Sequence, residues 1–227
     1  MSYVIAYNRP WCKDLPEILE KITGNEFIGI GSKEDLNLTK LKEIAPKTIF
    51  FPHWSYIIPK EIYESYNCII FHMTDLPYGR GGSPLQNLIV RGHKNTVISA
   101  IKCVKEIDAG PIYLKKPLTL DGSAEEIFVR ANQIIEGMIV EIIKKELKPI
   151  PQSGDVISFT RRKPADGNLN NTKSLDEVYD YIRMLDAEGY PKAFISLGDL
   201  KFEFTKASLN LDSVNANVKI TRETVNE

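Results

Sequence analysis

Histidine and aspartate side chains next to turns are the first candidates for chemistry in this 227-residue chain. The chain has three histidines, His53, His72 and His93, and a neutral imidazole can accept a proton near pH 7. His72 ends an apolar run and is followed by a glycine-rich loop, and Asp108 precedes an Ala-Gly-Pro turn. If both lie at the ends of neighbouring strands, they could form a general base and the carboxylate that orients it. The structural alternatives are a buried core histidine and an ordinary Asx turn.

The glycine-rich loop at residues 79–82 could also bind a phosphate, but its spacing does not favour this. It has neither the GxGxxG pattern of dinucleotide sites nor the GxxxxGK[ST] pattern of P-loops. The first apolar run, at residues 3–7, is followed by Asn-Arg-Pro-Trp, without the glycines that a dinucleotide site requires. No His, Cys or carboxylate positions around His72 have the close spacing of metal ligands. The sequence therefore predicts neither a nicotinamide enzyme nor a metal site.

Alternating strands and helices in the first half would place His72 at the carboxyl end of a strand. Four apolar runs predict buried strands, at residues 3–7, 26–31, 48–51 and 68–72. Between them we expect helices from Asp14 to about residue 22, over residues 36–44 and from near Pro59. This alternation favours a parallel sheet that is covered on both faces. Because ligands bind outside the carboxyl ends of such strands, His72 and its loop are well placed for function.

The second half continues with a short helix at residues 83–91 and extended segments at 96–104 and 111–118. Ser123 and Glu126 form a capping box before a long amphipathic helix that runs to about residue 147. Pro149 and Pro151 end this helix, which predicts two domains, residues 1–150 and 151–227. The second domain should contain strands at 156–161, 194–208 and 214–220 and a helix that begins after Ser174. The predicted fold class is α/β: an open, Rossmann-like, mostly parallel sheet with helices on both faces, plus a small α+β C-terminal extension.

Composition excludes several classes of protein. With 43% apolar and 26% charged residues, the chain is neither disordered nor a coiled coil. The formal net charge of −1 leaves no basic footprint for a long nucleic acid. Three cysteines without CxxC spacing predict neither a disulfide framework nor a zinc site. No apolar run reaches the roughly 20 residues of a membrane helix, and the N-terminal segment is not typical of a signal peptide. We therefore expect a cytoplasmic protein with reduced cysteines.

The loop after His72 resembles the signature loop of the folate-dependent formyltransferases, which include the methionyl-tRNA formyltransferases. That family reads Asn-x-His-x-Ser-Leu-Leu-Pro, followed by an Arg-Gly turn and a Pro-x-Gln helix start. The fitting positions here are His72, Leu76, Pro77, Arg80, Gly81, Pro84 and Gln86, with Thr74 at the family's serine. Asp108-Ala-Gly-Pro-Ile matches the family's Asp-x-Gly-Pro-Ile, and residues 52–59 correspond to its segment bordering the folate site. The stretches beginning at Ile182 and Tyr190 are similar to those of sugar-modifying and tRNA-modifying members.

The resemblance implies transfer of a formyl group from N10-formyltetrahydrofolate to a primary amine. His72 would remove the amine proton as general base, and Asp108 would orient the imidazole of His72 or supply negative charge to the site. The implied folate-binding residues are Trp54, Tyr56, Ile58, Pro77 and Gly110. The implied acceptor-binding residues are Thr74, Tyr78, Arg80, Gly81, Arg161 and Arg162.

One position departs from the family pattern. The family's asparagine, two residues before the histidine, helps to polarise the formyl oxygen, and it is Ile70 here. Isoleucine has no hydrogen to donate. Either Thr74, Asn67 or a loop N–H donates in its place, or the chemistry is weakened or altered.

Three acceptors compete under this resemblance. We favour a nucleotide-linked amino sugar, as in carbohydrate biosynthesis, because its diphosphate needs only one or two cations, from Arg80 or residues 161–163. tRNA is disfavoured because the tRNA-modifying members are longer and more basic, and glycinamide ribonucleotide because its enzymes usually lack such an extension. A catalytically weak folate- or sugar-nucleotide-binding protein is the alternative from another class. A homodimer could cover the unpaired strand edges of the C-terminal part.

Overall fold

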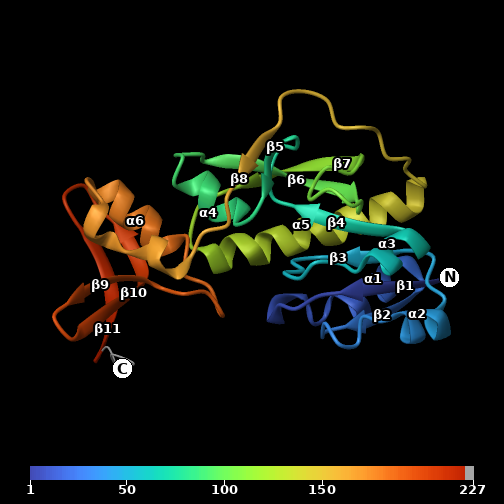
Figure 1. Cartoon of the computed structure of the whole chain (residues 1–227), viewed down its shortest axis with the longest axis horizontal. Coiled ribbons are helices and arrows are strands. Elements are labelled where there is room, and N and C mark those ends of the chain that lie inside the picture. Colours follow the sequence, from blue (N-terminus) through green and yellow to red (C-terminus); the bar gives the residue numbers. More distant parts are fainter. Residues whose placement is uncertain (223–227) are drawn as a thin grey trace. The chain divides into compact units, whose positions relative to one another are not determined.

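A six-stranded sheet organises the first of two units into which the chain divides. The computed structural model describes residues 1–222. The strand order is β2-β1-β3-β4-β6-β7 (Figure 1). Neighbouring pairs from β2 to β4 are parallel, whereas β6 is antiparallel to β4. The strands are β1 Ser2–Ala6, β2 Glu26–Ile30, β3 Ile49–Phe51, β4 Cys68–His72, β6 Asn95–Lys102 and β7 Ile112–Thr119. The predicted mostly parallel α/β sheet is therefore confirmed.

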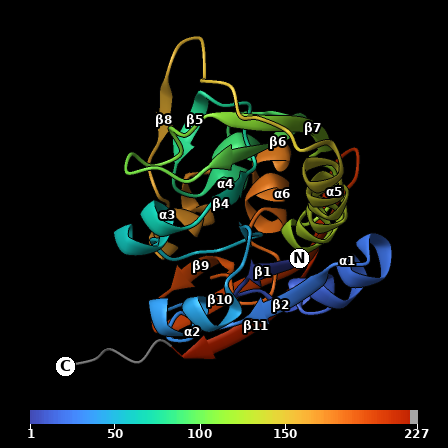
Figure 2. The same ribbon diagram turned by 90° about the vertical axis from the view of Figure 1, so that its right-hand side faces the viewer.

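Helices cover both faces of this sheet, as predicted. Figure 2 shows α1 and the part of α5 from Phe128 onward on one face, with α2 and α3 on the other. On the α1 face, Trp11 stacks on Phe128 of α5 with 5.3 Å between ring centroids. On the α2 face, Leu41 and Ile62 are buried among side chains of β1, β3 and β4. The helices are α1 Leu15–Thr23, α2 Leu38–Ile44, α3 Lys60–Ser65 and α5 Ala124–Lys145, with a short 3-10 turn, η1, at Pro10–Cys12.

Local hydrogen bonds explain where the helices begin. Helix α2 starts two residues later than predicted because the Asn37 side chain accepts the Lys40 N–H at 3.0 Å and caps it. The capping box before α5 is present: Ser123 N–H donates to Glu126 Oε2 at 2.7 Å, and Glu126 N–H donates to Ser123 Oγ at 3.3 Å. Asp14 occupies the N-cap position of α1 without a capping hydrogen bond from its side chain.

The loop after β4 contains a strand that sequence patterning did not predict. Strand β5, Tyr78–Gly81, forms a two-stranded sheet with β8, Ile157–Phe159. Ile157 N–H donates to Pro77 O at 3.4 Å. The Leu76–Pro77 peptide bond is cis. The segment between His72 and Tyr78 is therefore held by β4 at its start and by the pairing of β5 with β8 at its end.

The second unit comprises residues 82–95, 119–127 and the chain from Phe159 onward. Its antiparallel sheet has the order β11-β10-β9, and α6 packs against β10. Gln86 Nε2 donates to Met184 O at 3.0 Å, which ties an early segment of the chain to this late one. The predicted division at residue 150 falls within the stretch 128–158 of the first unit. The elements are α4 Pro84–Ile89, η2 Pro164–Gly167, η3 Leu169–Asn171, α6 Leu175–Arg183, β9 Ala193–Leu197, β10 Leu200–Leu209 and β11 Val214–Arg222.

None of the helices between residues 1 and 222 combines the length and the apolar character needed to cross a membrane.

Candidate active site

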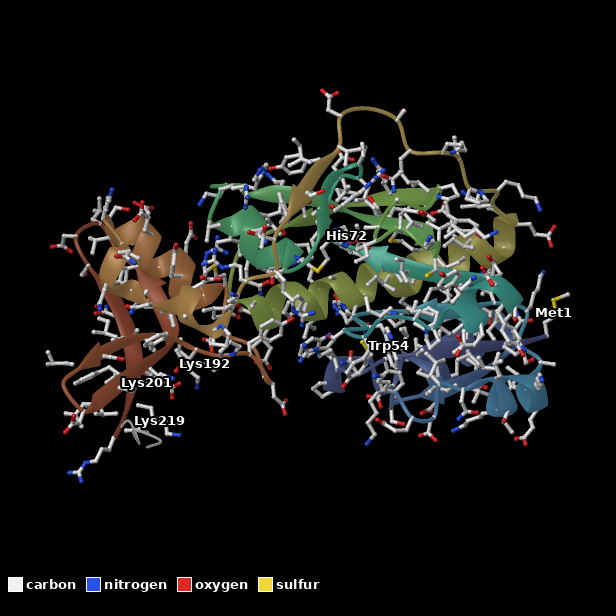
Figure 3. The ribbon with its side chains drawn as sticks, viewed as in Figure 1. Met1, Trp54, His72, Lys192, Lys201 and Lys219 are labelled. Carbon is white, nitrogen blue, oxygen red and sulfur yellow. The ribbon has the colours of Figure 1, made fainter. Side chains whose placement is uncertain are left out.

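His72 is the last residue of β4, and its side chain is largely buried (Figure 3). Its Nε2 lies 2.8 Å from Gly79 O, and its Nδ1 lies 3.6 Å from Asp108 Oδ2. A carbonyl oxygen can only accept, so Nε2 carries the hydrogen of the neutral ring and Nδ1 carries the lone pair. The two residues that were predicted to act together, His72 and Asp108, therefore lie close to each other. The basic nitrogen of His72 faces the carboxylate of Asp108.

Asp108 is held in the turn between β6 and β7. Its φ of +52° is left-handed, a conformation that aspartate tolerates better than most residues. Gly81 N–H donates to Asp108 Oδ2 at 2.9 Å, which ties the Asp108 side chain to the end of β5. Cys103, in the same turn, has its pKa raised to about 11 mainly by burial and further by the negative charge of Asp108. Cys103 is therefore a neutral thiol near pH 7.

Gln152 links the two loops that carry this pair, and no sequence motif predicts it. Its Oε1 accepts from Arg80 Nη2 at 2.7 Å and from Arg80 Nε at 3.1 Å. Its Nε2 donates to Asp108 O at 2.8 Å and to Gly110 O at 2.9 Å. A single glutamine thus joins β5 to the backbone around Asp108. It follows Pro149 and Pro151, at the predicted domain boundary, so only its long-range contacts identify it.

Three of the predicted acceptor-binding residues shape the loop after His72. Thr74 is fully buried, and its Oγ1 donates to Gly79 O at 3.4 Å while its own carbonyl accepts from Ser99 Oγ at 2.7 Å. Gly81 adopts a φ of +104°, a left-handed conformation that glycine adopts without strain. Tyr78 begins β5 and is half-buried. These contacts position His72 and Asp108, and acceptor binding by Thr74, Tyr78 and Arg80 stays a prediction.

Arg161 and Arg162 belong to the second unit. Arg161 is exposed. Arg162 has contacts within its own unit, because its Nη2 donates to Asp166 O at 2.8 Å and its guanidinium lies 5.5 Å from the centre of the Tyr181 ring. Their role in acceptor binding stays a prediction.

The predicted folate-binding residues have different surroundings. Trp54 and Tyr56 pack edge to face at 5.3 Å, and Tyr56 is 45% exposed. Ile58 is buried in the core cluster against α2 and α3, which explains it without a ligand. Pro77 is buried. A Cβ on Gly110 would lie 1.7 Å from Lys102 O, so the close approach of two backbones requires glycine there.

Ile70 lies two residues before His72 on β4, so both side chains point to the same face of the sheet. Asn67 lies at the other end of β4, where its amide donates to Thr48 Oγ1 and accepts from Tyr113 OH. Thr74 Oγ1 is committed to Gly79 O, and the Gly81 N–H to Asp108. None of these three groups is therefore available, in this arrangement, to replace the family's asparagine.

Within residues 1–222, no three His, Cys, Asp or Glu side chains are grouped so that they could hold a metal ion.

Comparisons with known proteins identify the family. The model of the methionyl-tRNA formyltransferase C-terminal domain matches residues 164–221. A solved methionyl-tRNA formyltransferase from Clostridium thermocellum is 47% identical, covers 98% of this chain and 99% of its own, and superposes with a TM-score of 0.95. The methionyl-tRNA formyltransferase of Thermodesulfovibrio yellowstonii is 28% identical over 185 residues. The matched region covers 78% of this chain but only 59% of that relative's length. A sugar N-formyltransferase from Shewanella sp FDAARGOS_354 is 16% identical, with a TM-score of 0.69 over 93% of this chain and 99% of its own.

These findings correct the predicted acceptor. The preference for a nucleotide-linked amino sugar over tRNA was wrong, and carbohydrate biosynthesis is not supported, since the sugar enzyme shares only the fold whereas the 47% identical relative is a methionyl-tRNA formyltransferase. Net charge misled because it sums the whole chain and does not report which charges face a partner. The recognition of a folate-dependent formyltransferase is confirmed. The chain belongs to the methionyl-tRNA formyltransferase family, whose formyl donor is N10-formyltetrahydrofolate.

Proposed function

We propose that this chain transfers the formyl group of N10-formyltetrahydrofolate to the amino group of methionyl-tRNA. The observation that supports this most directly is the pairing of His72 Nδ1 with Asp108 Oδ2 at 3.6 Å, at the carboxyl end of β4. Family membership supplies the donor and the acceptor, and the pair supplies the proton chemistry.

The proposed reaction moves one proton. The uncharged amine attacks the formyl carbon, and a new C–N bond forms as the carbonyl oxygen becomes an oxyanion. His72 Nδ1 accepts the proton that the amine nitrogen loses. The imidazolium then has both N–H groups partnered, one by Gly79 O and the other by Asp108. When the bond between the formyl carbon and N10 of the folate breaks, the same proton passes to N10.

The folate subsite is proposed to lie beside this pair. Trp54 and Tyr56 follow β3, the strand next to β4, and their rings offer a surface for a pterin or an aminobenzoyl ring. Pro77 borders the loop that carries Gly79. Thr74, Arg80 and Gly81 act through the shape of the loop, which holds His72 and Asp108 in place.

Ile70 favours a second candidate function, a binding protein that is catalytically weak. An oxyanion donor typically contributes about 10²–10³ in kcat, and isoleucine cannot supply one. Such a protein would bind folate tightly and transfer its formyl group slowly or not at all.

The test is to incubate the chain with N10-formyltetrahydrofolate and methionyl-tRNA, release the amino acid with mild base and measure formylmethionine by mass spectrometry. Formylmethionine that depends on His72, but not on His93, supports the proposal. Uncharged tRNA and a nucleotide-linked amino sugar serve as control acceptors. Tight folate binding without any formylmethionine would favour the binding protein instead.

A further inference from the structure

Four buried side-chain polar atoms within residues 1–222 have no hydrogen-bond partner in the structure. They are Asn8 Oδ1, Trp11 Nε1, His53 Nε2 and Trp54 Nε1. All four come from two short segments, residues 8–11 after β1 and residues 53–54 after β3. Buried polar groups are nearly always satisfied in native proteins. Their concentration in two loops therefore indicates a common cause.

The two loops lie side by side at the carboxyl edge of the sheet. Strands β1 and β3 are parallel neighbours, with Val4 opposite Ile49 and Ile5 opposite Phe50. β2 pairs with one edge of β1 and β3 with the other. The strand order therefore reverses direction at β1. This is the topological switch point of the sheet. In open α/β sheets, ligands bind in the crevice at this point.

Aromatic packing holds three of the four orphaned groups in place. The Trp11 ring stacks on Phe128, and His53 packs edge-on against both rings at 5.7 and 5.5 Å. Trp54 packs between Phe51 at 5.9 Å and Tyr56 at 5.3 Å. These contacts prevent the rings from turning to find partners elsewhere. The polar atoms are thus fixed before any ligand arrives, as in other preformed sites.

The chemistry of the orphaned atoms defines what they can bind. An indole N–H only donates, so Trp11 and Trp54 both require an acceptor. Burial, with a smaller contribution from the charge of Arg9, lowers the pKa of His53 to about 3, so its ring is neutral and Nε2 donates or accepts. The Arg9 guanidinium lies 5.9 Å from the centre of the Trp11 ring, and its Nη2 lies 3.4 Å from Ser55 Oγ. The Trp11 indole N–H donor beside the Arg9 guanidinium suits a negatively charged oxygen.

We propose that Asn8, Arg9, Trp11 and His53 form a subsite for an oxyanion, a phosphate or carboxylate group of a bound ligand. The Trp11 indole N–H would donate to one of its oxygens, Arg9 would supply the positive charge, and Asn8 Oδ1 would accept from a hydroxyl or N–H on the same ligand. The subsite lies one strand away from β4 and is therefore separate from the His72–Asp108 pair. It does not rest on the proposed formyl transfer.

Indole NMR tests this subsite directly, because Trp11 and Trp54 are the two tryptophans of the chain. The full chain, labelled with ¹⁵N, is titrated with inorganic phosphate, 5′-AMP or glutamate at constant ionic strength set by chloride. We expect the Trp11 indole cross-peak to move to lower field along a saturable curve, with the Trp54 peak as the internal reference. Trp11→Phe and Trp54→Phe variants assign the two peaks. A response to phosphate and 5′-AMP alone identifies a phosphate subsite, and a response to glutamate alone identifies a carboxylate subsite.

Arg9→Gln should weaken anion binding by about tenfold or more, the loss expected of a charged hydrogen-bond donor. Lys13→Gln is the matched control, since Lys13 is exposed and the charge change is the same. The unchanged remainder of each spectrum shows that the variants fold. The proposal is overturned if the Trp11 indole peak does not respond beyond chloride, which leaves buried water as the occupant. It is also overturned if Lys13→Gln weakens binding as much as Arg9→Gln.

Discussion

At the scale of single residues, the two nitrogens of His72 have different surroundings. Nε2 is tied to Gly79 O, and Nδ1 faces Asp108 beyond direct hydrogen-bond distance. A proton that Nδ1 takes from the attacking amine would lie next to the Asp108 carboxylate, so the geometry suits a base that accepts a proton at this nitrogen.

Ile70→Asn should raise the rate of formyl transfer. The new amide would lie on the same face of β4 as His72 and could donate to the formyl oxygen as it becomes negative. We expect kcat to increase on the order of 10², with little change in KM for the folate. Ile70→Val is the control, because it changes volume without adding a donor. An unchanged kcat in Ile70→Asn would show that another group already stabilises the oxyanion.

His53 should make stability depend on pH. Its folded pKa of about 3 is below its unfolded value of about 6.5, so the unfolded chain binds more protons between these values. Stability is thus full above about pH 6.5 and falls as the pH decreases toward 3. From pH 7 to 5 this group should cost about 2 kcal/mol. Urea unfolding of the wild type and of His53→Asn measures it, since Asn also tolerates the left-handed φ of +50°. Equal pH dependence in both would contradict the assignment.

At the scale of elements, the site consists of loops at strand ends that are held by a few long-range bonds. Gln152→Ala removes four hydrogen bonds to Arg80, Asp108 and Gly110. The Asp108 turn should then shift relative to His72, and kcat should fall about 10- to 100-fold. KM should change less than kcat.

Gln152→Glu separates the two halves of this link, because a carboxylate can still bind Arg80 but cannot donate to Asp108 O or Gly110 O. We expect it to be as slow as Gln152→Ala. Gln133→Ala, on an exposed position of α5, is the control. Wild-type kcat in either Gln152 variant would show that the link is not needed for positioning.

Gly110→Ala should destabilise the fold, because its Cβ would overlap Lys102 O. Moving one backbone away from the other should cost about 3 kcal/mol or more. Gly137→Ala is a matched control within α5, where nothing lies within 4 Å of the added Cβ. Alanine is the better helix former there, so this variant should gain about 0.5–1 kcal/mol. Thermal unfolding compares the two, and similar stabilities would contradict the close approach.

Local patterns predicted most elements correctly. The apolar runs that became β1 to β4 and the capping box at Ser123 both depend on neighbours within a few residues, which a sequence displays. Strand β5 was not predicted because Tyr-Gly-Arg-Gly has little strand preference and is extended only by pairing with β8. Gln152 was missed for the same reason, since its partners are 42 to 72 residues away.

At the scale of the whole molecule, sequence motifs predicted the reaction family but not the acceptor. His72 and Asp108 were found because the loop motif and the Asp-x-Gly-Pro turn are specific together. The acceptor was misjudged from net charge and chain length, which are global quantities and do not describe a binding surface. The match over residues 164–221 shows that the C-terminal segment itself carries the information that the charge count lacked.

A double-mutant cycle on His72 and Asp108 tests the central claim most directly. Formylmethionine production is measured for the wild type, His72→Ala, Asp108→Ala and the double variant, with His93→Ala as control. If the two residues act as one unit, each single variant should lose about 10²–10⁴ in kcat and the double variant little more. His93→Ala should stay within a few-fold of the wild type. Losses that simply multiply, or a His72→Ala variant as fast as the wild type, would contradict the account.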